Sequence, residues 1–154
     1  MAARVDILAV GSLHGDLRPA ARHYIDLLSP LVSVVVREVK EVPLRGRSPV
    51  EVHREEGRRL LAAWPRAPLV VALAVEGRTL GSEAFAVWLH AGLERGGVGF
   101  VIGGSLGLSE DVLARVDDRL SLSALTLPHQ LARVVLLEQL FRAAKILRGE
   151  TYHH

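Results

Sequence analysis

The stretch SLSALTLPHQLARVVLLEQLFRAAK, residues 121–145, decides the fold expected for this 154-residue chain. It alternates serine with leucine, passes through Pro128–His129 and enters an apolar segment whose spacing predicts a helix over residues 130–147. A short predicted strand, Leu120–Leu122, comes just before it. Neither element is long enough to fold alone, so we expect both to complete one domain that spans residues 1–154.

The rest of the chain alternates between predicted strands and predicted helices. Runs of apolar or β-branched residues predict strands over Val5–Val10, Leu31–Val39, Pro68–Val75 and Val98–Ile102. Helical spacing between them predicts helices over residues 16–28, 49–63, 82–93 and 110–116. This alternation favours an α/β fold whose mostly parallel sheet is covered by helices on both faces.

Local signals refine where these elements begin and end. Ser48 followed by Pro49 and Glu51 is a typical helix N-terminus with a capping box, and Ser109 is expected to cap the short helix near residue 110. We expect Ser82 to open the helix over residues 82–93. Glu76–Gly77 is expected to turn the chain at the end of the strand before it.

Composition excludes several classes of protein. The chain has no cysteine, which rules out disulfides, iron–sulfur clusters and thiolate zinc sites, and we expect no metal. No apolar run reaches the length of a membrane span, and the N-terminus lacks the long apolar region of a signal peptide, so a cytoplasmic protein without membrane contact is expected. The formal charge of +2 permits nucleic-acid binding, but an ordinary solvated surface explains it equally well.

The glycine-rich turn Gly103–Gly107, with sequence GGSLG, permits three interpretations. It matches G-x-S-x-G, so Ser105 with Asp117 or Asp118 and His129 gives the residue order of a hydrolase triad. Such hydrolases need more strands before the nucleophile and a long helix directly after it, which disfavours this alternative. The other two interpretations are a ligand-binding loop after a strand, and a plain glycine turn, which the motif alone favours.

Two further segments are expected to end at the same edge of the sheet, LAVEG at residues 73–77 and LSLSALTLPH at residues 120–129. Together with the glycine turn they predict one pocket. Its apolar walls would come from Leu73, Leu122, Leu125 and Leu127. Backbone N–H and C=O groups would supply its polarity. Such a pocket suits a flat heteroaromatic group such as adenine.

At this point the motifs resemble a known family. IGGSLGLS at residues 102–109, SLSALTLPH at 121–129, LFRA at 140–143 and YHH at 152–154 resemble the RlmH family of SPOUT-class methyltransferases, over the whole chain. The resemblance implies an α/β fold with a C-terminal trefoil knot, and S-adenosyl-L-methionine as cofactor. It also implies a homodimer in which each site borrows residues from the partner subunit. The implied reaction methylates N3 of a pseudouridine, in a stem-loop of the large-subunit (23S) ribosomal RNA.

The resemblance also assigns residues to the cofactor. The positions that match the family's cofactor-binding residues are Leu73, Gly103, Gly104, Leu122, Ser123, Ala124, Leu125, Thr126 and Leu127. All of them belong to the three segments already expected to form the pocket.

The residues that match family positions near the transferred methyl group are His129 and Arg142, and Tyr152, His153 and His154 fall on the family's C-terminal tail. That tail usually reads Tyr-His followed by Arg or Lys. Here His154 replaces the permanent charge with a titratable one, which puts the catalytic role of the tail in question.

Methylation at N3 requires removal of a weakly acidic proton, either by a general base or with cations that stabilise the anion. His129 is the candidate base, and Arg142 with His153 or His154 of a partner chain are the candidate cations. The simpler alternatives are a loop or cap role for His129 and an ion pair between Arg142 and Glu138.

The last predicted helix carries more apolar surface than one narrow stripe needs. Core packing explains this, and a dimer face is the further interpretation for Leu131, Val134, Val135, Leu137, Leu140, Phe141 and Ala144. The candidate phosphate contacts are Arg45, Arg47, Arg142, Lys145 and Arg148. Because the net charge is small, we expect assembled ribosomes rather than free RNA as the substrate. A non-catalytic RNA- or ribosome-binding module on the same fold is the alternative function.

Overall fold

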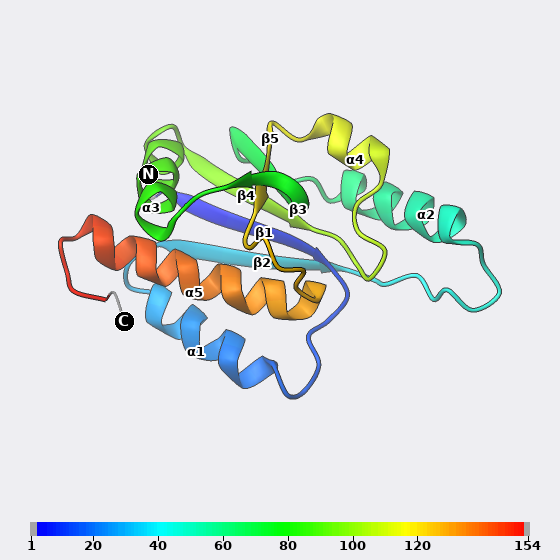
Figure 1. Cartoon of the computed structure of the whole chain (residues 1–154), viewed down its shortest axis with the longest axis horizontal. Helices are drawn as coiled ribbons and strands as arrows, with labels where there is room; N and C mark the ends of the chain where they lie inside the picture. Colours follow the sequence, from blue (N-terminus) through cyan, green and yellow to red (C-terminus); the bar gives the residue numbers. More distant parts are fainter. Residues whose placement is uncertain (1–2, 153–154) are drawn as a thin grey trace.

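The computed structural model describes residues 3–152, which form a five-stranded sheet in the order β2-β1-β4-β3-β5 with every neighbouring pair parallel (Figure 1). The strands are β1 (Arg4–Val10), β2 (Ser33–Val39), β3 (Leu69–Thr79), β4 (Gly97–Ile102) and β5 (Asp118–Ser121). The helices are α1 (Arg18–Leu28), α2 (Pro49–Ala62), α3 (Ser82–Glu94), α4 (Glu110–Arg115) and α5 (His129–Leu147). The expected α/β alternation and parallel sheet are confirmed.

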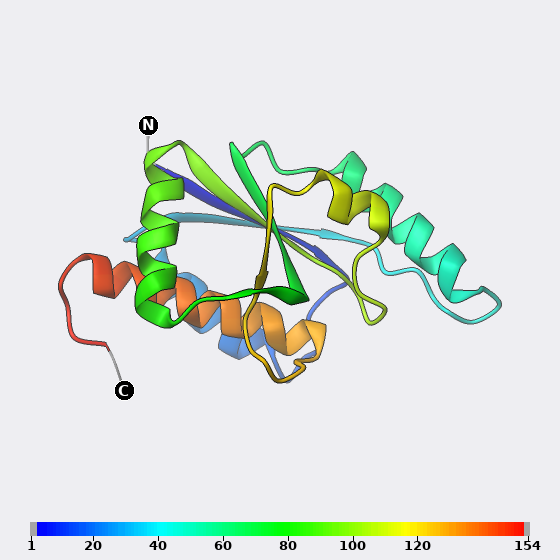
Figure 2. The same ribbon diagram turned by 45° about the horizontal axis from the view of Figure 1, so that its top comes forward.

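Helices cover both faces of the sheet, as expected for a parallel sheet. Successive side chains of a strand point to opposite faces, so Val5 and Ile7 of β1 pack in the core beneath α1, α3 and α5. Leu8 and Val10 pack on the other face with Leu60 of α2. Both views show α1, α3 and α5 on one side of the sheet and α2 and α4 on the other (Figure 2).

Both predicted helix caps are confirmed. Ser48 Oγ accepts a hydrogen bond from the backbone N–H of Glu51 at 3.2 Å, and Ser109 caps α4 in the same way. The prediction that Ser82 opens the third helix is also confirmed, because α3 begins at Ser82 with Gly81 at its N-cap. The Ser82 hydroxyl donates to Oε1 of Gln139 at 2.8 Å and thereby links α3 to α5.

The predicted turn at Glu76–Gly77 is wrong, because β3 continues through it to Thr79. Leu73 and Arg78 both align with Leu120 of β5, so the residues between them bulge out of the ladder. A Cβ added to Gly77 would lie 2.7 Å from backbone atoms of Arg119 and Leu120. Gly77 therefore allows β3 and β5 to approach closely. A glycine in the sequence is equally compatible with such an approach and with a turn.

Helix α5 buries most of its apolar residues within its own chain. Val134, Leu137, Leu140 and Phe141 all lie in the core that α5 forms with α1 and α3. Leu131 stays exposed. Core packing thus accounts for most of the apolar surface of this helix.

None of the helices within residues 3–152 is both long and apolar enough to cross a membrane. The same residues contain no group of three or more His, Cys, Asp or Glu side chains placed to hold a metal ion.

Candidate functional site

A cleft of about 850 Å³ opens at the carboxyl edge of β3, β4 and β5. The three segments expected to meet there do so, since the lining runs through residues 73–76, 102–108 and 121–129. Eight of the nine residues assigned to the cofactor border it, namely Leu73, Gly103, Gly104, Leu122, Ser123, Leu125, Thr126 and Leu127. Ala124 is exposed and does not border the cleft.

The bulge in β3 supplies one wall of the cleft. Ala74, Val75 and Glu76 lie between Leu73 and Arg78, the two residues that align with the same residue of β5. These three residues are left out of the ladder with β5 and line the cleft.

The glycine turn forms the second wall, and its conformation excludes the hydrolase alternative. The N–H of Gly107 donates to the carbonyl of Gly104 at 3.0 Å, and Gly107 has a φ of +80°. A Cβ added to Gly103 would lie 2.6 Å from the backbone of Gly107. The chain therefore closes on itself here, and α4 begins only at Glu110, so Ser105 does not lead into the helix that a nucleophile elbow requires.

The two aspartates proposed for the hydrolase triad, Asp117 and Asp118, bind other partners. The carboxylate of Asp117 accepts the backbone N–H of Val70 at 2.8 Å, and Asp118 forms an ion pair with Arg78 at 2.7 Å. Neither carboxylate orients His129, so the Ser-Asp-His interpretation is wrong.

The segment before α5 forms the third wall and is shaped by its own hydroxyls. Ser121 Oγ donates to the carbonyl of Ser123 at 2.8 Å, and Ser123 Oγ accepts the N–H of Leu125 at 2.9 Å. These local bonds turn the chain without help from a second element. Leu125 is left 77% exposed beside the cleft.

His129 is the first residue of α5 and borders the cleft half-buried. Pro128 holds the N-cap position, and the hydrogen bonds among residues 3–152 include none to the His129 ring. Burial lowers the pKa of His129 below its usual value, and this outweighs the nearby carboxylates of Glu41 and Glu56, which raise it. The neutral imidazole is therefore favoured at pH 7, as a proton acceptor requires.

The first turn of α5 is tied to the ends of β1 and β2 by residues that the sequence did not single out. Gln130 Oε1 accepts the backbone N–H of His14 at 2.6 Å. The buried Arg133 guanidinium donates to the carbonyl of Gly11 at 2.8 Å and pairs with Glu38. These contacts fix where His129 stands relative to the cleft.

Arg142 does not reach the cleft of its own chain. It lies 13 residues beyond His129 on the same helix, about 20 Å away at the helical rise of 1.5 Å per residue. Its guanidinium pairs with Glu138 at 2.9 Å, as the simpler alternative predicts. It also donates to the carbonyl of Tyr152 at 2.9 Å and lies 4.9 Å from the centre of the Tyr152 ring.

Tyr152 in turn packs edge-on against Phe141, with ring centres 4.9 Å apart. Arg142 therefore holds the end of the chain against α5. The other two residues expected on the tail, His153 and His154, lie outside the described residues.

Comparison with known proteins decides the family. The profile described as "Predicted SPOUT methyltransferase" matches residues 3–153. This chain belongs to the SPOUT methyltransferase family. It is 48% identical to Ribosomal RNA large subunit methyltransferase H of Rubrobacter xylanophilus over 157 residues, 99% of each chain. It is 43% identical to the protein of the same name from Carboxydothermus hydrogenoformans, over 97% of this chain and 98% of the relative.

A solved SPOUT-like structure supports the fold independently of close sequence similarity. TrmJ from Z. mobilis ZM4 superposes with a TM-score of 0.56 at 19% identity, over 97% of this chain and 72% of that chain. The expected SPOUT fold class is thus confirmed, while the trefoil knot within it stays a prediction. A SPOUT methyltransferase needs a methyl donor, and the cleft is large enough to hold one.

Proposed function

We propose that this protein is an S-adenosyl-L-methionine-dependent methyltransferase that acts on large-subunit (23S) ribosomal RNA, with N3 of a pseudouridine as the acceptor. Two findings together support the proposal. Relatives that match over nearly their full length are named for large-subunit rRNA methylation, and the motifs that resemble that family line the cleft. The same names disfavour the alternative of a non-catalytic RNA-binding module. The acceptor atom rests on the resemblance to the RlmH family.

The residues around the cleft fit the proposed cofactor. Leucine side chains from two walls offer aliphatic contact to an adenine ring, and the glycine and serine loops present backbone groups without bulky side chains. The residues proposed to hold the cofactor are Leu73, Gly103, Gly104 and residues 122–127. S-Adenosyl-L-methionine would supply an activated methyl group on a sulfonium, so the protein needs no metal for the transfer.

The protein itself would position the cofactor and the RNA base and remove the proton from N3. We place His129 as the group that accepts the N3 proton, because it borders the cleft and burial keeps it neutral. Arg142 lies too far along α5 to act in the same cleft, so its contribution is to a site on a second copy of the chain. In this proposal Arg142 and the tail residues Tyr152, His153 and His154 contribute to the partner's site of a homodimer, where Arg142 and a protonated His153 or His154 would stabilise the anion left at N3.

The substrate in this proposal is the assembled ribosome or large subunit, and the protein is cytoplasmic. A formal charge of +2 gives one chain little attraction to naked RNA, so shape and other ribosomal components would add contacts.

The test begins with calorimetric titration of the full chain with S-adenosyl-L-methionine. Saturable binding is expected, and Ser123→Phe, which places a ring in the cleft wall, should abolish it. Val87→Phe is the matched control, because Val87 is 68% exposed on α3 and does not border the cleft. Transfer of a labelled methyl group to unmodified ribosomes, followed by nucleoside mass spectrometry, then identifies the acceptor. Binding without any transfer to ribosomes or their subunits would contradict the proposed reaction.

A further inference from the structure

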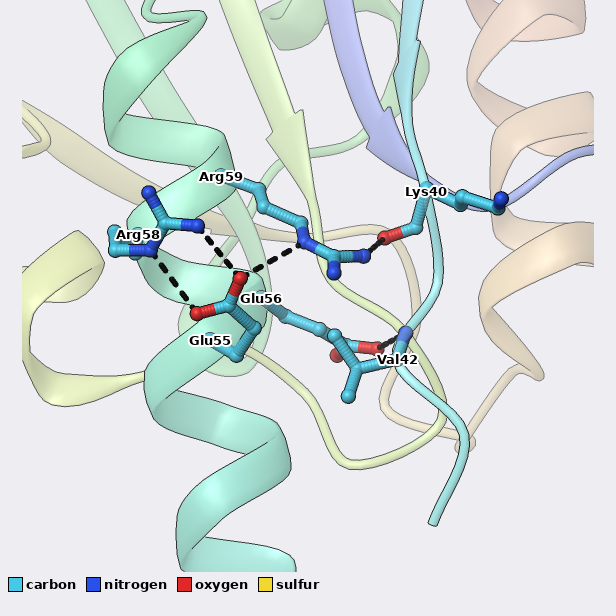
Figure 3. A network of polar contacts seen from close by, with 6 residues as sticks. All are labelled: Lys40, Val42, Glu55, Glu56, Arg58 and Arg59. Atoms are coloured by element: carbon cyan, nitrogen blue, oxygen red, sulfur yellow. Dashed lines mark hydrogen bonds and ion pairs between the residues drawn. The ribbon is translucent and has the colours of Figure 1, made fainter. Parts of the chain in front are cut away.

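Two consecutive glutamates of α2 stand in opposite surroundings (Figure 3). Glu55 points to solvent-accessible arginines and pairs with Arg58 at 2.7 Å and Arg59 at 3.2 Å. The hydrogen bond from Arg58 is the largest of the contacts that lower the pKa of Glu55 to about 2. Glu56 points the other way, toward the sheet, and is only 4% exposed.

The carboxylate of Glu56 has a hydrogen bond but no counter-charge. It accepts the backbone N–H of Val42 at 3.0 Å, and none of the ion pairs among residues 3–152 includes it. Arg59, which Figure 3 draws on the same helix, instead donates to Glu55 and to the carbonyl of Lys40. A buried carboxylate without a cation is unfavourable, so its presence calls for a compensating charge.

Glu56 lies directly behind the glycine wall of the cleft. A Cβ built on Gly104 would lie 3.1 Å from Glu56 Oε1 and 3.5 Å from Oε2, and Gly104 borders the cleft. Glu56 therefore lies against Gly104, and no side chain stands between its carboxylate and the backbone of this wall residue. Its field also reaches the other side of the cleft, since Glu56 is one of the charges that act on His129.

We propose that Glu56 provides the counter-charge for a cationic ligand in the cleft, and that it gives the cleft a preference for the sulfonium of S-adenosyl-L-methionine over the neutral thioether product. This inference rests on the proposed function. The sulfur loses its positive charge when the methyl group leaves, so the attraction of Glu56 applies to the donor and not to S-adenosylhomocysteine. The carboxylate would thus favour exchange of product for fresh cofactor.

The competing role for Glu56 is purely structural, as the acceptor that fixes Val42 and the loop around it. Glu56→Gln separates the two roles, because the amide oxygen still accepts the N–H of Val42 while the charge is gone. Glu55→Gln is the matched control, since it removes one charge from the adjacent residue of the same helix at a site that the arginines and solvent already neutralise.

The experiment is calorimetric titration of the full chain with three ligands: S-adenosyl-L-methionine, S-adenosylhomocysteine, and sinefungin, which carries an ammonium in place of the methylsulfonium group. Glu56→Gln should weaken both cationic ligands by about tenfold, the effect of one partly screened charge at several ångströms, and leave S-adenosylhomocysteine within about twofold. Glu55→Gln should leave all three affinities unchanged.

An equal loss for all three ligands, or no loss for any, would overturn the role of Glu56. A wild-type protein that binds none of the three would overturn the proposed cofactor itself, which the first titration reveals before any variant is made. Should Glu56→Gln fail to fold, Glu56→Asp retracts the charge by one methylene group. Its preference for cationic over neutral ligand should then fall by about threefold, and an unchanged preference would count against the inference.

Discussion

His129 combines a position at the cleft with a lowered pKa. Burial is the largest influence on that pKa and takes it below the usual 6.5. Because the unprotonated ring is the form that accepts a proton, the rate of methyl transfer should rise with pH and reach a plateau, with a midpoint below 6.5. Single-turnover transfer to ribosomes between about pH 5 and pH 9 measures this midpoint.

His129→Asn should remove the acid limb of this profile and slow transfer by about 100-fold, while cofactor affinity stays near that of the wild type. The control is His90→Asn, because His90 is an exposed side chain of α3 that faces Glu94. A full rate for His129→Asn, or a midpoint well above 6.5, would exclude His129 as the proton acceptor.

Single residues differ in how far the sequence reveals their roles. Ser48 and the glycines of the cleft wall were predictable because their signals are local: a cap needs an oxygen three residues before its donor, and a tight turn needs glycine. Glu56 and Arg133 were missed because their burial depends on partners far along the chain. A weak signal existed for Glu56, which stands four residues from Val52 and from Leu60 on the apolar face of its helix.

The path of β3 depends on Gly77. Because an added Cβ would lie 2.7 Å from backbone atoms of β5, Gly77→Ala should push the two strands apart and lower the free energy of unfolding by about 2 kcal/mol. It should also distort the bulge that forms one wall of the cleft and weaken cofactor binding. Gly15→Ala is the matched control, since nothing lies within 4 Å of its added Cβ. Urea unfolding of both variants measures the difference, and equal stabilities would refute the close-approach argument.

The first turn of α5 depends in the same way on Arg133. Arg133→Met keeps the aliphatic length but leaves the carbonyl of Gly11 without its donor and Glu38 without its cation, so a loss of about 2–3 kcal/mol is expected. The exposed pair of Arg148 with Glu150 offers a control, because Arg148→Met should change stability by less than about 0.5 kcal/mol. Urea unfolding of both variants measures the two losses. Indistinguishable losses would mean that the Arg133 contacts do not anchor the helix.

Elements were easier to predict than their ends. Strand β4 is a continuous apolar run, β1 is apolar from Ile7 to Val10, and α5 has a long helical spacing, so both kinds of element are visible in the residues themselves. The strand order β2-β1-β4-β3-β5 is not visible in the residues, because it depends on which crossovers bury the most apolar surface. The bulge in β3 was missed for the same reason: Gly77 is informative only once β5 lies beside it.

His129 and Arg142, the two residues proposed to act on the acceptor, lie far apart within one chain. His129 borders the cleft at one end of α5, whereas Arg142 holds the C-terminal segment near the other end. If both act in one reaction, they belong to different copies of the chain, and the active site exists only in a dimer. Leu131 and Leu147, at 38% and 39% exposure, and the half-buried Val135 are among the apolar residues of α5 left for contact with a second copy.

Mixing two impaired variants tests this arrangement. His129→Asn and Arg142→Ala should each slow transfer strongly when alone, because every site of either homodimer lacks one group. Equimolar mixing with subunit exchange gives about half heterodimers, and each of these has one intact site and one doubly altered site. About a quarter of wild-type activity should therefore return, measured as methyl transfer to ribosomes. A mixture of His129→Asn with His129→Gln should recover nothing, and activity no higher than that of the separate variants in the first mixture would place both residues in the same chain's site.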